Sequence, residues 1–296
     1  MKKIFYIALG LIGFTTSCDY VENPIVATAG PSSDCDTVFN FTNAPNTDRN
    51  VLLEDYTGHN CPACPGHAAI AESKKATWGD RLIIVAIHPD AGGLTDPQTG
   101  SSLTTDWRIE EGKKYAVAVN NNSPLSSLPA LGFNRTANGV NLHYGTSWIT
   151  PFDNYMPTVG SSDIGIQIDA EKLPDNTICG KVETELLADL NDDFMIKFWL
   201  VQDSIQDWQN SDPNYWHRHV LRDVYGHVGE EEGDASGNGN IWGNSLSQGV
   251  TGDKEQFIVS FEPKPEWGTE HFYIVAMVYN DATKEIMQVE QYALDH

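Results

Sequence analysis

The sequence predicts an α/β unit in its first half and an all-β unit in its second half. Between residues 51 and 155, short apolar runs alternate with stretches whose apolar positions recur at helical spacing. From about residue 156 onward, only strand-like runs separated by turn clusters follow. A chain of 296 residues, 40% of them hydrophobic, is long enough to build a core for each unit. We therefore expect a domain boundary near residues 156–162.

The first unit, residues 48–157, is expected to alternate strands and helices. In chain order we expect a strand at 51–56, a helix at 62–78, a strand at 81–88, a loop at 89–105, a helix at 106–119, a strand at 128–135, a hairpin turn at 136–139, a strand at 140–145 and a closing helix at 147–156. Asp106 is expected near the N-cap of the second helix. A strand–helix–strand unit followed by a hairpin is the topology of thioredoxin-like domains.

The second unit, residues 158–296, is expected to be an immunoglobulin-like β-sandwich. Its clearest strand-like runs lie at 163–171, 194–202, 257–263, 271–280 and 286–294, separated by turn clusters such as LPDN and KPEWG. Strands of this length and spacing predict a sandwich of about seven strands.

The composition limits the partners of the protein. The formal net charge is −23. A chain this acidic lacks the cations that neutralise a nucleic-acid backbone or that dock on an anionic membrane surface. We expect no nucleic-acid partner. We also expect no cofactor, because the sequence has no phosphate-binding loop, dinucleotide fingerprint or Ser/His/Asp nucleophile motif.

The first residues have the pattern of an export signal. Two lysines precede a short apolar run at residues 4–14, which predicts a signal peptide over residues 1–17. The sequence Thr-Thr-Ser then precedes Cys18 and resembles a bacterial lipobox. We expect Cys18 to be lipid-modified and to anchor the chain to a bilayer, with residues 18–47 as a tether and lead-in segment. The alternative is an ordinary signal peptide with an incidental cysteine.

The motif Cys61-Pro-Ala-Cys64 lies where an apolar strand passes into a helix. Unpaired backbone N–H groups and the helix dipole stabilise a thiolate at such a position. Cys61 is therefore the candidate nucleophile and Cys64 the candidate resolving thiol. Pro129 is the third candidate, because a cis-proline entering this strand of a thioredoxin-like fold lies against the dithiol and pairs with substrate.

Two other interpretations of this motif stay open at this point. The pair could be a structural disulfide, since such bonds also stabilise extracytoplasmic domains. Alternatively, His59, Cys61, Cys64 and His67 form a compact Cys₂His₂ set of the type that binds zinc or copper. If Cys61 pairs with Cys64, Cys35 and Cys179 remain as a long-range pair, although four cysteines allow three pairings.

Two weaker patterns could hold a metal ion. His217 and His219 alternate and are expected on one face of a strand, as metal ligands or as packing groups beside aromatic residues. A second segment carries oxygen ligands at the spacing of a calcium loop, namely at Asp234, Ser236, Asn238 and Asn240. The twelfth position of that loop is Ser245 rather than Glu, so a solvated loop is the alternative.

Three segments carry a family resemblance. VLLEDYTGHNCPACP, FWLVQDSIQDWQ and YWHRHVLRDVYGHVGE together resemble the 28-kDa-outer-membrane-protein-related lipoproteins of Bacteroidetes, over residues 48–292. The resemblance implies an outer-membrane lipoprotein, at the cell surface or on the periplasmic face, with a thioredoxin-like domain and a β-sandwich. It also implies an adhesin-like or receptor-like protein that binds an unknown protein or surface ligand. The alternative function is a thiol–disulfide oxidoreductase that acts on exported proteins through Cys61 and Cys64.

Overall fold

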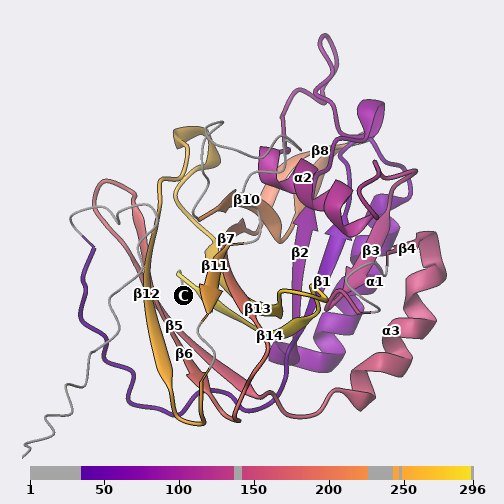
Figure 1. Cartoon of the computed structure of the whole chain (residues 1–296). Helices are drawn as coiled ribbons and strands as arrows, with labels where there is room; N and C mark the ends of the chain where they lie inside the picture. The colour runs from indigo at the N-terminus through magenta and orange to yellow at the C-terminus, as the bar shows by residue number, and fades with distance from the viewer. Residues whose placement is uncertain (1–34, 137–141, 226–242, 247–248, 295–296) are drawn as a thin grey trace, which may run out of the picture.

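The computed structural model describes residues 35–136, 142–225, 243–246 and 249–294 (coloured in Figure 1). Several sequence predictions lie outside these residues: the signal peptide, Cys18, most of the tether, the tip of the turn at 136–139 and the four calcium-loop candidates Asp234, Ser236, Asn238 and Asn240. Within the described part of the chain, no helix has the length and apolar character needed to span a bilayer.

The predicted order of elements in the first unit is confirmed. The structure has β1 (Val51–Tyr56), α1 (Cys64–Trp78), β2 (Leu82–Ile87), α2 (Glu110–Val119), β3 (Ala130–Phe133), β4 (His143–Tyr144) and α3 (Ile149–Tyr155). Successive residues of β1 point to opposite faces: Val51 and Leu53 contact α1 and α3, whereas Leu52 and Tyr56 face the side of α2. Because both faces are covered, every residue of β1 and β2 is buried.

The start of α2 differs from the prediction. The helix begins at Glu110 with Ile109 at its N-cap, four residues later than expected, and no side chain caps it. Asp106 is engaged elsewhere, because its carboxylate accepts hydrogen bonds from the backbone N–H (3.1 Å) and the Nε (2.8 Å) of Arg108. This local bond favours a turn rather than the first turn of a helix.

The second half of the described chain contains ten strands. They are β5 (Ile164–Lys172), β6 (Ile178–Leu186), β7 (Phe194–Gln202), β8 (Ile205–Gln209), β9 (Asp212–His217), β10 (Val220–Val224), β11 (Asn244–Leu246), β12 (Lys254–Phe261), β13 (Phe272–Asn280) and β14 (Ile286–Ala293). The sequence analysis named five of them and expected about seven. It missed β6, β10 and β11, and it did not recognise β8 and β9 as a hairpin, because polar residues interrupt these strands.

A single large sheet runs through both halves of the chain. Its order is β14-β13-β7-β10-β2-β1-β3-β4, with β11 also paired to β7. β1 is parallel to β2 and antiparallel to β3, and β10 joins β2 in parallel through Val220 and Ala86. The boundary predicted at residues 156–162 therefore does not separate two sheets, because strands from either side of it are hydrogen-bonded together.

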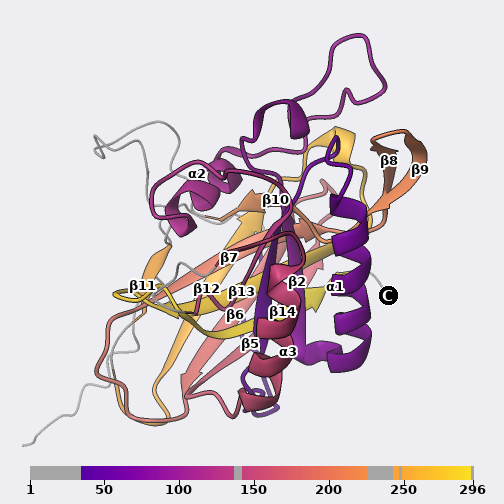
Figure 2. The ribbon, with the colours of Figure 1, turned by 90° about the vertical axis from the view of Figure 1, so that its right-hand side faces the viewer.

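Two layers cover one face of the large sheet, at its two ends (Figures 1 and 2). Helices α1 and α3 lie beside one another at one end, and the three-stranded sheet β12-β6-β5 lies at the other. Phe198 and Leu200 of β7 point toward the three-stranded sheet and share a core with Val182 and Val259. On the opposite face, Trp199 shares a core with residues of β1, β2 and α2. The mixed α/β architecture thus contains a two-sheet sandwich.

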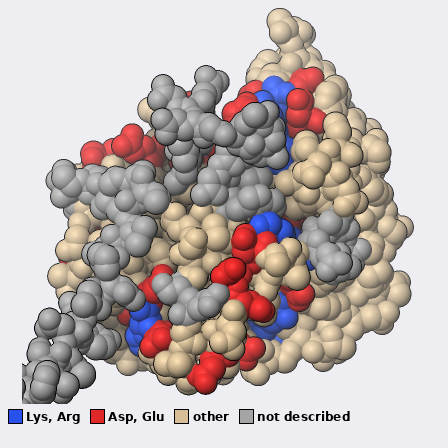
Figure 3. All heavy atoms as spheres, viewed as in Figure 1, with Lys and Arg blue, Asp and Glu red and all other residues tan. Residues whose placement is uncertain are grey.

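Charged side chains on the surface lie in mixed clusters. On the face shown in Figure 3, Asp and Glu form several patches, and Lys and Arg lie beside most of them. Arg108, for example, contacts the carboxylates of Asp96 and Asp106. The Asp and Glu side chains nevertheless outnumber the Lys and Arg side chains, 41 to 18, which gives the formal net charge of −23.

A buried ion pair links the two halves of the chain. Arg135, which follows β3, donates to both carboxylate oxygens of Glu54 on β1, at 2.8 and 3.1 Å, and each side chain is 2% exposed. The Arg135 guanidinium also lies 5.5 Å from the ring centroid of Tyr115 on α2 and 5.8 Å from that of Tyr279 on β13. The pair therefore contacts elements from both sides of the predicted boundary.

We expect Glu54→Gln to lower the free energy of unfolding by roughly 3 kcal/mol, because the substitution leaves the buried Arg135 charge uncompensated. Urea denaturation measures this change. The matched control is Glu110→Gln, which breaks the exposed pair with Lys113 and should cost less than about 1 kcal/mol. Equal losses for the two variants would show that burial does not govern the contribution of the Glu54 pair.

Candidate functional site

The Cys61–Cys64 pair forms a disulfide at the beginning of α1. The S–S distance is 2.09 Å and the Cα atoms are 5.4 Å apart. Cys64 is the first residue of α1 and Cys61 lies in the turn before it, so the helix begins two residues later than the sequence predicted. The turn leaves β1 through Thr57, whose N–H donates to Ile87 O (2.9 Å) at the end of β2.

The tip of the β8–β9 hairpin covers this turn. Gln209 Nε2 donates to the carbonyl oxygens of Gly58 (3.0 Å) and Cys61 (3.3 Å). Asn210 Nδ2 donates to the same Cys61 oxygen at 3.0 Å, and Asn210 N donates to His59 O at 2.8 Å. Cys61 is 1% exposed and Cys64 is 2% exposed. Both cysteines are therefore almost fully shielded from solvent in this arrangement.

The loop at 89–105 borders the disulfide turn on another side. Asn60 N donates to Leu94 O (3.1 Å), and Asn60 Nδ2 donates to Gly93 O (2.8 Å). The approach is so close that a Cβ at Gly58 would collide with the Leu94 carbonyl. Glycine is thus required at this position by the close approach of the two backbones.

Pro129 lies near the end of β1 but outside the cavity described below. The Leu128–Pro129 peptide bond is cis. Ala130 pairs with Tyr56, so Pro129 lies at the level where the disulfide turn leaves β1. Its carbonyl oxygen accepts a hydrogen bond from Gly145 N at 3.1 Å.

A cavity of about 550 Å³ opens beside the disulfide. Its walls are one face of α1, the carboxyl ends of β1 and β2, strand β9 and the turn between β9 and β10. Cys64 lines this cavity, together with Asp55 from β1 and His88, which follows β2. Figure 2 shows the β8–β9 hairpin next to the first turn of α1, which is the place where these walls meet.

Asp55 is a buried carboxyl in the floor of the cavity. The residue is 3% exposed, and its Oδ1 has no hydrogen-bond partner among the described residues. Burial raises the pKa of Asp55 from its ordinary value of 3.8 to about 7, although the nearby His219 acts in the opposite direction.

The sequence analysis overlooked Asp55; a carboxylate at the end of the apolar run VLLEDY was the available signal. Nothing in the sequence indicated Gln209 and Asn210.

The two histidines of the YWHRH segment do not share a strand face, so that prediction was wrong. β9 ends at His217 and β10 begins at Val220, and His219 between them has φ = 55°. His217 stacks on Trp107, with ring centroids 4.3 Å apart. Burial lowers the pKa of His217 to about 4, so its ring is neutral at pH 7. His219 instead places Nε2 2.8 Å from Glu72 Oε1 on α1.

The Cys₂His₂ set around the disulfide is likewise not assembled for a metal. His59 Nε2 lies 3.2 Å from Asp96 O, and His67 Nδ1 accepts a hydrogen bond from Trp148 Nε1 at 3.3 Å. Both cysteines are in the disulfide. Across the described ranges, no cluster of three or more His, Cys, Asp or Glu residues has the arrangement of a metal site.

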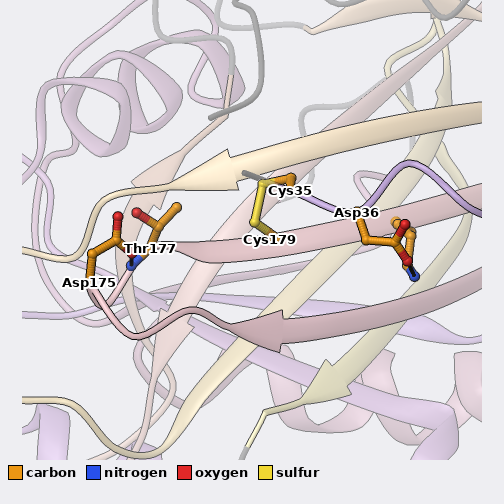
Figure 4. Close-up of a disulfide and its surroundings, with 6 residues drawn as sticks. Cys35, Asp36, Asp175, Thr177 and Cys179 are labelled. Atoms are coloured by element: carbon orange, nitrogen blue, oxygen red, sulfur yellow. Dashed lines mark hydrogen bonds and ion pairs between the residues drawn. A yellow bond between two sulfur atoms is a disulfide. The ribbon is translucent and has the colours of Figure 1, made fainter. Parts of the chain in front are cut away.

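A second disulfide, Cys35–Cys179, joins the beginning of the described chain to β6 (Figure 4). Its S–S distance is 2.02 Å, and both cysteines are buried against Ile258 of β12. Beside it, Lys181 donates to Asp36 Oδ2 at 3.1 Å. The segment before β1 is thus held covalently on the three-stranded sheet.

Because its pKa is raised, Asp55 should make stability fall as pH rises. Between pH 4 and 7 the folded state keeps a proton that the unfolded chain has lost, so stability falls as pH rises through this window, and the contribution of Asp55 is fully lost above pH 7. We expect the free energy of unfolding of Asp55→Asn, relative to that of the wild type, to rise by on the order of 3 kcal/mol between pH 4 and pH 8. Urea denaturation at several pH values measures this, with the exposed Asp163→Asn as control. Parallel profiles for wild type and Asp55→Asn would contradict the assignment.

Comparison with known proteins identifies the fold. No known family model matches the chain, and no curated protein does. Among solved structures, HBP35 of Porphyromonas gingivalis matches with a TM-score of 0.60 and 15% identity, covering 85% of this chain and 77% of that chain. A domain of the outer membrane lipoprotein Omp28 from the same organism matches with a TM-score of 0.31 and 21% identity, covering 45% of this chain and 89% of that chain. The chain thus shares its mixed α/β fold with HBP35.

Proposed function

We propose that this protein is an outer-membrane lipoprotein of the binding or adhesion type, in which Cys61–Cys64 serves as a closed structural disulfide. The lipobox-like sequence before Cys18 supports the lipid anchor. The partner is an unidentified protein or surface ligand.

One observation carries the choice of a closed disulfide: the hairpin tip binds the Cys61 carbonyl. A thiol–disulfide exchange needs the attacking sulfur to reach the disulfide. The hydrogen bonds from Gln209 and Asn210 hold β8 and β9 over Cys61, which is 1% exposed. Such occlusion suits a bond that stabilises the turn rather than one that turns over with protein substrates.

We further infer that the first unit is a thioredoxin-like domain and the second an immunoglobulin-like sandwich. The partial order β2-β1-β3-β4, with β1 parallel to β2 and antiparallel to β3, supports the first assignment. The three-stranded sheet packed on β7 and β13 supports the second. In this proposal β10 is the strand through which the sandwich extends the sheet of the first domain.

The second candidate function is thiol–disulfide oxidoreductase activity on exported proteins. A specific observation favours it: Asp55, whose pKa is about 7, lines the same cavity as Cys64. In that reaction the Cys61 thiolate attacks a substrate disulfide and releases one substrate thiolate. The Cys64 thiol then loses its proton and attacks Cys61, which releases the second substrate thiol and leaves the enzyme oxidised. An external dithiol must reduce the pair again.

An insulin-reduction assay with dithiothreitol distinguishes the two functions. We expect the wild-type protein to be no faster than Cys61→Ser, because the hairpin blocks the approach of insulin to Cys61. Turbidity of the precipitating insulin chains measures the rate. A wild-type rate clearly above that of Cys61→Ser would replace the binding function by the oxidoreductase function.

The hairpin contact can be tested without any substrate. Gln209→Ala removes two hydrogen bonds to the disulfide turn, so we expect reduction of Cys61–Cys64 by dithiothreitol to become about tenfold faster. Mass spectrometry after alkylation measures the free thiols over time. The matched control is Gln206→Ala, an exposed residue of the same hairpin, which should leave the rate unchanged. If the two variants react alike, the contact does not protect the disulfide.

A further inference from the structure

We infer that the cavity between α1, β2 and β9 is a binding site for a small organic cation, a protonated amine on an aromatic or aliphatic body. In this site Asp55 accepts the hydrogen bonds of the ammonium group. This inference rests on the proposed binding function and names a ligand class for it. It is carried by three features of the cavity: a buried carboxylate whose Oδ1 has no partner in the described part of the chain, an excess of carboxylate side chains, and apolar walls.

The first feature is the carboxylate of Asp55. Buried carboxylates in folded proteins are normally paired or hydrogen-bonded, because an unpaired one is costly. Asp55 is 3% exposed and its Oδ1 lacks a partner among the described residues, yet the side chain lines an open cavity. The nearest cationic candidate, His219, already places its Nε2 against Glu72 at 2.8 Å. A ligand N–H group in the cavity would supply the missing donor.

The second feature is the charge of the lining. Three carboxylate residues, Asp55, Glu72 and Asp212, line the cavity, against the single guanidinium of Arg218. Arg218 is 53% exposed and lies 3.9 Å from Glu72 Oε2, so it does not offset the charge at the floor. Three histidines also line the cavity: burial lowers the pKa of both His88 and His217, and His219 faces Glu72 at 2.8 Å. The cavity therefore favours a cation over an anion.

The third feature is the apolar lining around Asp55. One face of α1 presents the small side chains of Ala68, Ala69 and Ala71, and β2 adds Ile84. Small residues on the helix leave the space that larger ones would fill. The volume of about 550 Å³ lies within the range of roughly 300–1,000 Å³ that is usual for small-molecule sites.

Aromatic side chains complete the rim. Tyr215 and Trp216 on β9 both line the cavity, and Trp216 is 52% exposed. An exposed indole at the mouth of an acidic cavity is a surface on which a flat or cationic ligand stacks. Since no metal cluster is present in the described ranges, the combination of carboxylate, apolar wall and aromatic rim points to an organic cation rather than a metal ion.

The test uses three ligands that differ in charge and share one aromatic body. Tryptamine is the cation, tryptophol its neutral counterpart and indole-3-propionate the anion, each titrated calorimetrically into the full chain in non-ionic detergent. We expect tryptamine to bind, tryptophol to bind at least about tenfold more weakly because it lacks the charged hydrogen bond, and indole-3-propionate not to bind. Equal binding of tryptamine and tryptophol, or no binding of tryptamine, overturns the inference.

Asp55→Asn and a pH series identify the residue that binds the cation. We expect the variant to lose the preference for tryptamine over tryptophol, whereas Asp163→Asn, outside the cavity, keeps it. In the wild type, tryptamine affinity should rise from pH 6 to pH 8 as Asp55, with a pKa near 7, loses its proton. The pH series needs no variant, so it decides the matter even if Asp55→Asn does not fold. A flat series, or an unchanged preference in folded Asp55→Asn, excludes Asp55 as the binding group.

The outcomes separate this inference from the proposed function. If tryptamine fails to bind while insulin reduction stays at the level of Cys61→Ser, the ligand class is wrong and the closed-disulfide proposal stands. If insulin is reduced in a Cys61-dependent manner, the proposed binding function with a closed disulfide is wrong, whether or not tryptamine binds.

Discussion

The backbone pairing of β10 with β2 is the constraint on which the rest of the structure depends. Val220 lies opposite Ala86, and Ala86 N donates to His219 O at 2.7 Å. This short contact fixes the end of β9 at the edge of the first unit. From there the β8–β9 hairpin can reach back over the disulfide turn. The covered disulfide and the acidic cavity are both consequences of this one junction.

The two halves also share their interior, so neither buries its apolar surface alone. One core contains Leu52 and Val85 from the first half beside Trp199 and Met277 from the second. The same face holds the Glu54–Arg135 pair. Buried apolar side chains and the buried ion pair thus both join the two halves across the predicted boundary. The strands of the second half therefore help to position Asp55 and Cys64. The chemistry of the turn before α1 cannot be understood from the first unit by itself.

The sequence predicted local structure well and long-range contacts poorly, for physical reasons. The apolar runs of β1 and β2 are continuous because both faces of these strands are buried. The disulfide motif at the start of α1 is likewise one short segment of the sequence. The start of α2 was misplaced because Asp106 bonds Arg108 instead of capping the helix. The contacts of Gln209 and Asn210 join residues about 150 positions apart, and no local pattern in the hairpin reveals its partner. His219 was misplaced because its positive φ breaks the strand alternation.

The Cys35–Cys179 bond would have a mechanical consequence in the lipid-anchored protein that we propose. Figure 1 shows the first described residues beside the three-stranded sheet, far from the β8–β9 hairpin. If Cys18 carries the proposed lipid, tension on the chain before Cys35 would pass through the disulfide into β6 before it reached β1 and α1. The β8–β9 hairpin and the cavity beside α1 would then carry none of this force directly.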